Sequence, residues 1–197
     1  MERTSQAMSI VAAVAMLTLL TACDGDPESM PPPSSSTSPS STPLSSATPS
    51  TTPKPTAPTV PPAATNGLTV TSAEAFARFY LQVLDHLEGT GDASLMRRWA
   101  DPSCKSCRLL ASTFEDVYKK GGAVTGDYQT VDVKVSEARL SGADTAFVRL
   151  SGSEGTSYWR KSSGSAPSTF APHEVRWELT LAALEGHWAM FAMVKKA

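Results

Sequence analysis

Two cysteines, Cys104 and Cys107, stand one helical turn apart, so their sulfur atoms can reach each other. Such a pair forms a structural disulfide, acts as a thioredoxin-like redox pair, or supplies two ligands of a zinc site. Redox chemistry expects a strand–helix–strand setting, whereas the segment before Cys104 has a helical pattern. Zinc needs four ligands, and the other candidates stand singly along the chain (His86, His173 and His187). We therefore expect a structural disulfide and no metal or other cofactor.

The third cysteine, Cys23, follows a segment that is typical of secretion. Residues 1–7 are polar and contain Arg3, and an apolar run of 13 residues extends from Met8 to Leu20. That run is well short of the ~20 residues that span a bilayer. A basic start, a short apolar stretch and small residues before a cut site are the features of a signal peptide.

The sequence Leu20-Thr21-Ala22-Cys23 resembles the lipobox of bacterial lipoproteins. The resemblance implies removal of residues 1–22 as a signal peptide and attachment of a diacylglyceryl group, with acyl chains such as palmitate, to Cys23. Localisation would then be the extracytoplasmic face of the cell membrane. Two acyl chains are enough for stable attachment, because each buried CH2 contributes about 0.8 kcal/mol. An ordinary signal peptide that happens to be cut before a cysteine is the alternative.

Residues 31–66 form a block of distinct composition. They contain 11 Pro and 17 Ser or Thr in 36 residues, and Lys54 is the only charged residue. Without large apolar side chains such a segment cannot offset the entropy of ordering, so residues 23–66 are predicted to be a lipidated cysteine and a disordered linker. An extended polyproline conformation at ~3.1 Å per residue would reach up to about 110 Å.

Residues 67–197 have the pattern of one folded domain with no net charge. They contain 15 Lys or Arg and 15 Asp or Glu, without a basic run. This balance argues against nucleic acid as a partner and against a polybasic membrane patch.

Helical periodicity dominates the first half of this domain. Thr71 and Glu74 have the spacing of a capping box, and an apolar stripe follows until Gly89 and Gly91. A short second helix begins after Asp92, and a third is expected to start at Asp101, with Asp as its cap.

After residue 122 the period changes to two, which predicts strands joined by short turns. The strands are expected near residues 131–135, 146–150, 156–161, 174–181 and 187–194, with a polar loop at 162–172. The core-facing sets of the two clearest strands contain no ionisable residue (Val131, Val133 and Val135; Val175, Trp177, Leu179 and Leu181). The fold class is therefore α+β, with three N-terminal helices packed on a curved antiparallel sheet of about five strands.

This order of elements resembles the cone-shaped NTF2-like (SnoaL-like) fold, and Gly186-His187-Trp188 looks like its Gly-x-Trp ending. A closer resemblance, to actinobacterial lipoproteins with an uncharacterised domain, rests on the motifs Gly91-Asp92, Asp101-Pro102-Ser103-Cys104, Cys107, Tyr118 and Gly121-Gly122. It covers most of residues 67–197 and implies location and fold, but no established activity.

No catalytic residue is predicted. The chain contains no phosphate loop, no His-Glu-x-x-His motif and no nucleophile elbow. Asp85 falls on the polar side of the first helix, where we expect it to be solvated. Four aromatic residues could line an apolar cavity, although large aromatics more often fill a core (Phe79, Tyr80, Trp177 and Trp188).

These features predict a membrane-anchored module that binds an envelope protein or a small apolar ligand without catalysis. A small enzyme of the isomerase or lyase type, using a pocket inside the cone, is the alternative. An acid and a tyrosine converging in such a pocket would favour the enzyme.

Overall fold

The computed structural model describes residues 55–196. The predicted signal peptide, Cys23 and most of the predicted linker lie outside the described residues. Three α-helices precede two antiparallel sheets, so the α+β class is confirmed. The elements are η1 (Pro62–Thr65), α1 (Val70–Thr90), α2 (Ser94–Arg98), α3 (Lys105–Lys119), β1 (Ala123–Gly126), β2 (Val131–Leu140), β3 (Thr145–Glu154), β4 (Ser157–Arg160), β5 (Ser168–Phe170), β6 (His173–Leu184) and β7 (His187–Lys196).

Helix α1 begins two residues earlier than its sequence pattern predicts. Thr69, not Thr71, is the N-cap, and its side chain accepts a hydrogen bond from the Ser72 amide at 3.1 Å. The Ser72 hydroxyl in turn accepts from the Thr69 amide at 3.0 Å, which completes the capping box. The helix ends as expected at Gly91, whose φ of 72° a residue with a side chain rarely adopts.

The third helix is also capped by a different residue from the one predicted. Cys104 is the N-cap of α3, and the Asp101 carboxylate instead accepts a hydrogen bond from the Ser103 amide at 2.7 Å, in the turn before the helix. Cys104 and Cys107 form a disulfide, with their Cα atoms 5.4 Å apart. Both cysteines are buried, so the bond closes the first turn of α3 inside the core.

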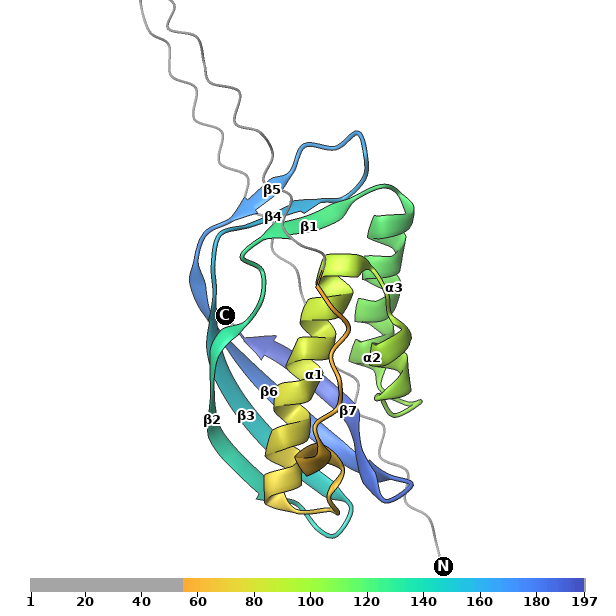
Figure 1. Cartoon of the computed structure of the whole chain (residues 1–197), viewed down its shortest axis with the longest axis vertical. Helices are drawn as coiled ribbons and strands as arrows, with labels where there is room; N and C mark the ends of the chain where they lie inside the picture. The colour runs from red at the N-terminus through yellow and green to blue at the C-terminus, as the bar shows by residue number, and fades with distance from the viewer. Residues whose placement is uncertain (1–54, 197) are drawn as a thin grey trace, which may run out of the picture. The chain divides into compact units, whose positions relative to one another are not determined.

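The strands form two sheets rather than the single sheet of about five strands that the sequence predicts. The larger sheet has the order β2-β3-β6-β7 and the smaller one the order β1-β4-β5. The prediction missed β1 and β5, because β1 has only four residues and β5 lies in a polar loop with all three residues exposed. In Figure 1 the larger, curved sheet faces α1, and the smaller sheet lies near the C-terminal end of that helix.

Two of the three register shifts in the larger sheet change which side chains reach the core. The register of β2 shifts between Val131 and Lys134, where Asp132 has a φ of 53°. Val131 is consequently 52% exposed, contrary to its predicted core position. A second shift, opposite Thr180 and Leu181, leaves Phe191 exposed between the buried Met190 and Met193 of β7.

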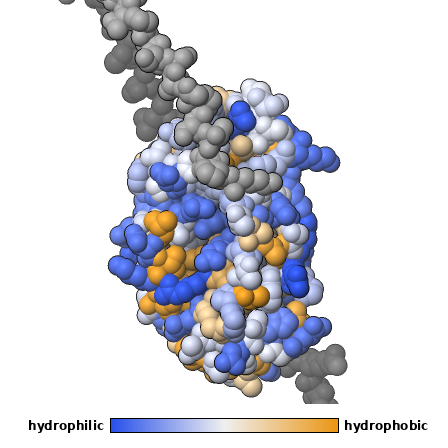
Figure 2. All heavy atoms as spheres, viewed as in Figure 1, coloured by the Kyte–Doolittle hydropathy of each residue, from blue (hydrophilic) through white to orange (hydrophobic). Residues whose placement is uncertain are grey.

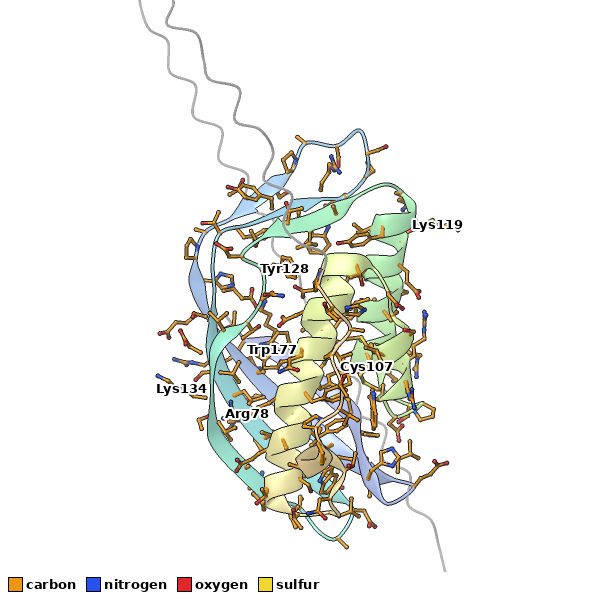
Figure 3. All side chains as sticks on the ribbon, in the orientation of Figure 1. Arg78, Cys107, Lys119, Tyr128, Lys134 and Trp177 are labelled. Atoms are coloured by element: carbon orange, nitrogen blue, oxygen red, sulfur yellow. A yellow bond between two sulfur atoms is a disulfide. The ribbon has the colours of Figure 1, made fainter. Side chains whose placement is uncertain are left out.

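The core lies between α1 and the concave face of the larger sheet. Its largest fully buried side chains include Trp188, Tyr80 and Phe76. In Figure 3, Trp177 lies between α1 and the sheet, whereas Lys134 points outward from β2. The surface facing the viewer in Figure 2 carries hydrophobic atoms interspersed with hydrophilic ones. No helix within residues 55–196 has both the length and the hydrophobicity that crossing a bilayer requires.

The folded part begins before residue 67, inside the segment that its composition assigns to the linker. Helix η1 places Ala64 fully inside the core, and Val60 packs against that core. Pro55 and Pro58 line a surface hollow together with side chains of α1. Prolines in an extended segment can pack in this way because their φ is already fixed, so ordering them costs less entropy.

Candidate ligand-binding pocket

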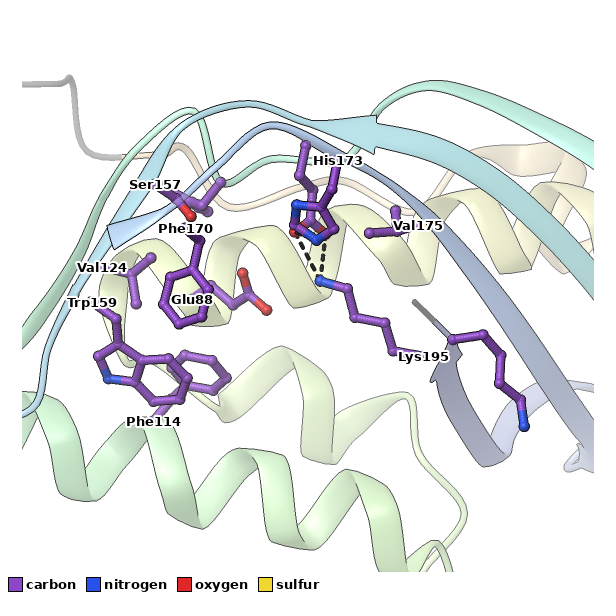
Figure 4. Close-up of a pocket in the computed structure, with 12 residues that line it drawn as sticks. Glu88, Phe114, Val124, Ser157, Trp159, Phe170, His173, Val175 and Lys195 are labelled. Atoms are coloured by element: carbon purple, nitrogen blue, oxygen red, sulfur yellow. Dashed lines mark hydrogen bonds and ion pairs between the residues drawn. The ribbon is translucent and has the colours of Figure 1, made fainter. Parts of the chain in front are cut away.

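A pocket of about 360 Å³ lies between α1, α3 and the ends of both sheets (Figure 4). This volume falls in the range of small-molecule sites, about 300–1,000 Å³. One part of the wall is aromatic and aliphatic and the other carries charged groups. The lining residues are Glu88, Phe114, Val124, Tyr128, Glu154, Ser157, Trp159, Phe170, His173, Val175, Lys195 and Lys196.

An ion pair between Glu154 and Lys195 forms part of the charged wall. The Lys195 ammonium donates to the two carboxylate oxygens of Glu154, at 2.6 and 2.8 Å. The Thr130 hydroxyl donates to the same carboxylate at 3.3 Å, and the His173 Nε2 lies 3.7 Å from it. Glu154 is only 8% exposed, so these neighbours compensate a charge that water scarcely reaches.

Glu88 brings a second carboxyl into the pocket from the last turn of α1. In the view of Figure 4 its carboxyl lies between the Phe170 ring and the Lys195 ammonium, and this half-buried side chain has no hydrogen-bond partner among the described residues. Burial raises the pKa of Glu88 to about 8, while Lys195 lowers it and the nearby Asp85 and Glu154 raise it further. Because the loss of hydration outweighs the attraction of Lys195, this carboxyl holds its proton near neutral pH.

Asp85 lies one helical turn before Glu88 and is half-buried, not solvated as the sequence pattern predicts. Its carboxylate accepts a hydrogen bond from the Thr130 amide at 3.3 Å. Burial raises the pKa of Asp85 to about 7 despite that hydrogen bond. The prediction failed because α1 is buried on more than one side: Leu81, four residues earlier on the same face, is 2% exposed.

Aromatic side chains build the opposite wall. The rings of Phe114 and Trp159 stack with centroids 5.5 Å apart and planes 18° from parallel. The Trp159 indole N–H is buried and has no hydrogen-bond partner among the described residues. Tyr128 is 4% exposed, and burial raises its pKa to about 12, so the phenol stays neutral.

The four aromatic residues proposed from the sequence as pocket lining are placed elsewhere. Phe79, Tyr80 and Trp188 are fully packed in the core and line none of the described pockets. The Tyr80 hydroxyl donates to the Met96 carbonyl, and the Trp188 indole donates to the Ser72 hydroxyl. Trp177 borders a separate hollow on the sheet and lies 5.2 Å below the Lys195 ammonium. The large aromatic residues that follow the periodicity of a helix or a strand therefore fill the core of this domain.

The residues that do line the pocket were missed for identifiable reasons. Tyr128 lies between two strands, and Phe170 lies in a three-residue strand, so neither belongs to a periodic pattern. One signal was present: Glu88 follows buried Leu84 by four residues and therefore extends the apolar face of α1. An acid that continues an apolar stripe is a candidate for a buried functional group.

The cysteines and histidines within residues 55–196 do not converge on a metal site. Cys104 and Cys107 are bonded to each other, and of the three histidines only His173 borders the pocket. Within residues 55–196, no three His, Cys, Asp or Glu side chains are grouped so that they could hold a metal ion.

The fold, in which a long helix faces a curved antiparallel sheet, has NTF2-like proteins among its structural neighbours. Residues 45–193 match the Family of unknown function (DUF6318), and the chain belongs to that family. No curated protein matches the chain.

Similarity to solved structures concerns the fold alone. The chain is similar to the intermembrane space region of chloroplast protein ARC6, with 11% identity, 66% of this chain and 97% of that chain covered, and a TM-score of 0.55. It is also similar to an NTF2-like protein of unknown function in nutrient uptake from Rhodospirillum rubrum (13% identity, 61% and 96% covered, TM-score 0.41). A third is an NTF2-like protein from Cytophaga hutchinsonii (13% identity, 62% and 96% covered, TM-score 0.38).

Proposed function

We propose that this protein is a lipid-anchored extracytoplasmic lipoprotein whose domain binds a small organic molecule in the pocket beside α1. One observation carries the binding function: a cavity of about 360 Å³ combines aromatic walls with a carboxyl, Glu88, that has no partner among the described residues. Glu88 is half-buried, and a carboxyl that has lost part of its hydration without gaining a partner is unfavourable, so a ligand that supplies the partner lowers this cost.

The anchoring part of the proposal rests on the sequence before the domain. Cys23 follows Leu20-Thr21-Ala22 in the manner of a lipobox, and a Pro/Ser/Thr-rich segment separates it from the domain. Cys23→Ala should release the protein from the membrane fraction into the medium. Retention of Cys23→Ala in the membrane, or a mature chain that begins with an unmodified Cys23, contradicts the anchor.

Ligand binding is testable with a neutral fluorescent probe, N-phenyl-1-naphthylamine, whose emission rises in an apolar site. The wild-type protein should bind the probe saturably. Val124→Phe, which places a larger side chain on the pocket wall, should weaken binding at least tenfold. Val70→Phe makes the same change at an exposed position on the first turn of α1 and should leave binding unchanged. Equal effects of the two variants would refute a site in this pocket.

A second candidate function, an enzyme of the isomerase or lyase type, is favoured by the two acids of α1. Burial moves the pKa values of Asp85 and Glu88 to about 7 and 8, near the working range of a general acid or base. One experiment distinguishes the two candidates. The protein is purified from its native membranes, and any bound molecule is extracted from it. This molecule should be recovered unchanged after incubation with the fresh protein if the protein only binds. Conversion by wild type but not by Glu88→Gln would instead establish the enzyme.

A further inference from the structure

We propose that the pocket selects an organic cation: an amine or quaternary ammonium group on an aromatic or aliphatic frame. Glu88 would face the positive charge, and the aromatic wall would enclose the frame. This inference rests on the proposed binding function and specifies its ligand class. It follows from the Glu88 carboxyl, which has no hydrogen-bond partner among the described residues, and from the aromatic walls of the cavity.

Two carboxyls, Glu88 and Glu154, line the pocket, and a third, Asp85, lies one helical turn from Glu88 in a neighbouring hollow. Asp85, Glu88 and Glu154 influence one another electrostatically, and Lys195 is the cation that acts on all three carboxyls. Lys195 donates to both carboxylate oxygens of Glu154 and is therefore already paired with that carboxylate. Lys196, which also lines the pocket, is 53% exposed and lies 4.0 Å from Glu178.

Glu88 is the carboxyl of the pocket whose side chain forms no hydrogen bond or ion pair with the described residues. Asp85 accepts the Thr130 amide, and Glu154 accepts Lys195 and the Thr130 hydroxyl, whereas the Glu88 side chain accepts nothing from the described residues. An ionised carboxylate in such a site needs an opposite charge, and a cationic ligand would provide it. An anionic ligand would instead meet the two carboxyls that line the pocket, Glu88 and Glu154.

The walls next to Glu88 suit a cation as well as an apolar frame. Phe114 and Trp159 present stacked rings, and Phe170 and Tyr128 complete the aromatic lining. Aromatic faces attract cations by about 0.5–2 kcal/mol each, and Trp does so most strongly. Carboxyl and ring faces together therefore discriminate a cation from a neutral molecule of the same shape.

Cation binding should be linked to proton release from Glu88. Because the pKa of this carboxyl is raised to about 8, the free pocket holds a proton at pH 7 that a bound cation would displace. The ionised form becomes more abundant as pH rises, so cation affinity should increase more than about tenfold from pH 6 to pH 8. The titratable groups that surround Glu88 are Asp85, Tyr118, Tyr128, Glu154, His173 and Lys195.

Three probes that share a phenyl ring and differ in charge test the inference by calorimetry on the full-length protein: benzyltrimethylammonium, benzyl alcohol and benzoate. Benzyltrimethylammonium should bind at least tenfold more tightly than the other two, with release of up to one proton as measured in buffers of different ionisation enthalpy. Glu88→Gln should weaken its binding at least tenfold and abolish the pH dependence. Glu74→Gln, the same change on α1 outside the pocket, should do neither.

The outcomes separate this inference from the function on which it rests. Tighter binding of benzyl alcohol or benzoate, or a cation affinity that does not depend on Glu88, overturns the cation inference while the pocket still binds N-phenyl-1-naphthylamine. Failure of that neutral probe to bind overturns the proposed function itself. Glu88→Gln preserves the size of the side chain, and an unchanged affinity of this variant for the neutral probe shows that its pocket is intact.

Discussion

The Trp188 indole donates a hydrogen bond of 2.9 Å to the Ser72 hydroxyl, across 116 residues of sequence. Ser72 is also the N3 residue of the capping box at the start of α1, so one buried hydroxyl joins the last strand to the first helix. The same oxygen lies 2.7 Å from the Gly67 carbonyl, which ties the segment before the helix to this point. Ser72 therefore connects three parts of the fold.

Ser72→Ala should destabilise the protein by about 2 kcal/mol. The substitution removes the side-chain half of the capping box and leaves the Trp188 N–H buried without its partner. Thr71→Ala is the matched control, because Thr71 is exposed and its hydroxyl caps nothing among the described residues. Urea unfolding measures the free energy of unfolding of both variants. Equal losses for the two variants would place the cap at Thr71 instead.

The periodic elements were predictable because burial on one side imposes a repeat. The buried face of α3, with Cys107, Ala111 and Phe114, and the alternation of Val175, Trp177 and Leu179 in β6 both follow directly from the sequence. A β-bulge interrupts this repeat, because one extra residue at Asp132 turns Val131 toward solvent. The composition of the strand does not reveal the position of such a bulge.

The candidate site was less predictable than the fold. The pocket draws its lining residues from α1, α3, the loop at Tyr128 and every described strand except β2, so no window of sequence contains it. Glu88 alone carried a local signal, as an acid that extends the apolar stripe of α1 beyond Leu84. The other lining residues come together only through tertiary packing, which no single stretch of the sequence reveals.

Gly89→Ala should destabilise the protein by about 1–3 kcal/mol, although Ala normally favours a helix over Gly by about 1 kcal/mol. The added Cβ would overlap the hydroxyl oxygen of Tyr128, and Pro55 also lies close. Tyr128→Phe in the same chain should recover part of the loss. Gly164→Ala adds a Cβ with no atom within 4 Å and should change stability by less than about 0.5 kcal/mol. Thermal unfolding compares all four proteins, and a stabilising Gly89→Ala would show that Tyr128 packs elsewhere.

Replacement of both Cys104 and Cys107 by Ala should destabilise the protein by about 2 kcal/mol, because the disulfide closes a loop of only four residues. Both cysteines are at most 2% exposed, so a thiol reagent followed by mass spectrometry should label neither of them in the native protein, even with mild reductant. Wild type reduced under denaturing conditions should match the stability of the double variant after refolding. Rapid reduction of the native protein would instead favour the redox interpretation.

The stability of the protein should fall as pH rises through the range in which Glu88 and Asp85 would ionise. Burial raises the pKa of Glu88 to about 8 and that of Asp85 to about 7, from ordinary values of 4.5 and 3.8. Between these limits the folded chain holds more protons than the unfolded chain, so the free energy of unfolding decreases with pH. Their contribution is fully present below pH 4 and is lost above pH 8.

Glu88→Gln isolates the larger part of this effect. Urea unfolding of wild type should show a decrease of about 2 kcal/mol from pH 5 to pH 9, given about 1.4 kcal/mol per pKa unit and partial screening by solvent. Glu88→Gln should show a shallower decrease, since Asp85 still titrates, and should exceed wild type in stability at pH 9. Glu74→Gln should follow the wild-type curve, because Glu74 lies on the same helix outside the pocket. A wild-type profile that is flat or rises over this range would mean that Glu88 is already ionised at neutral pH, with a counter-charge reaching it in the free protein.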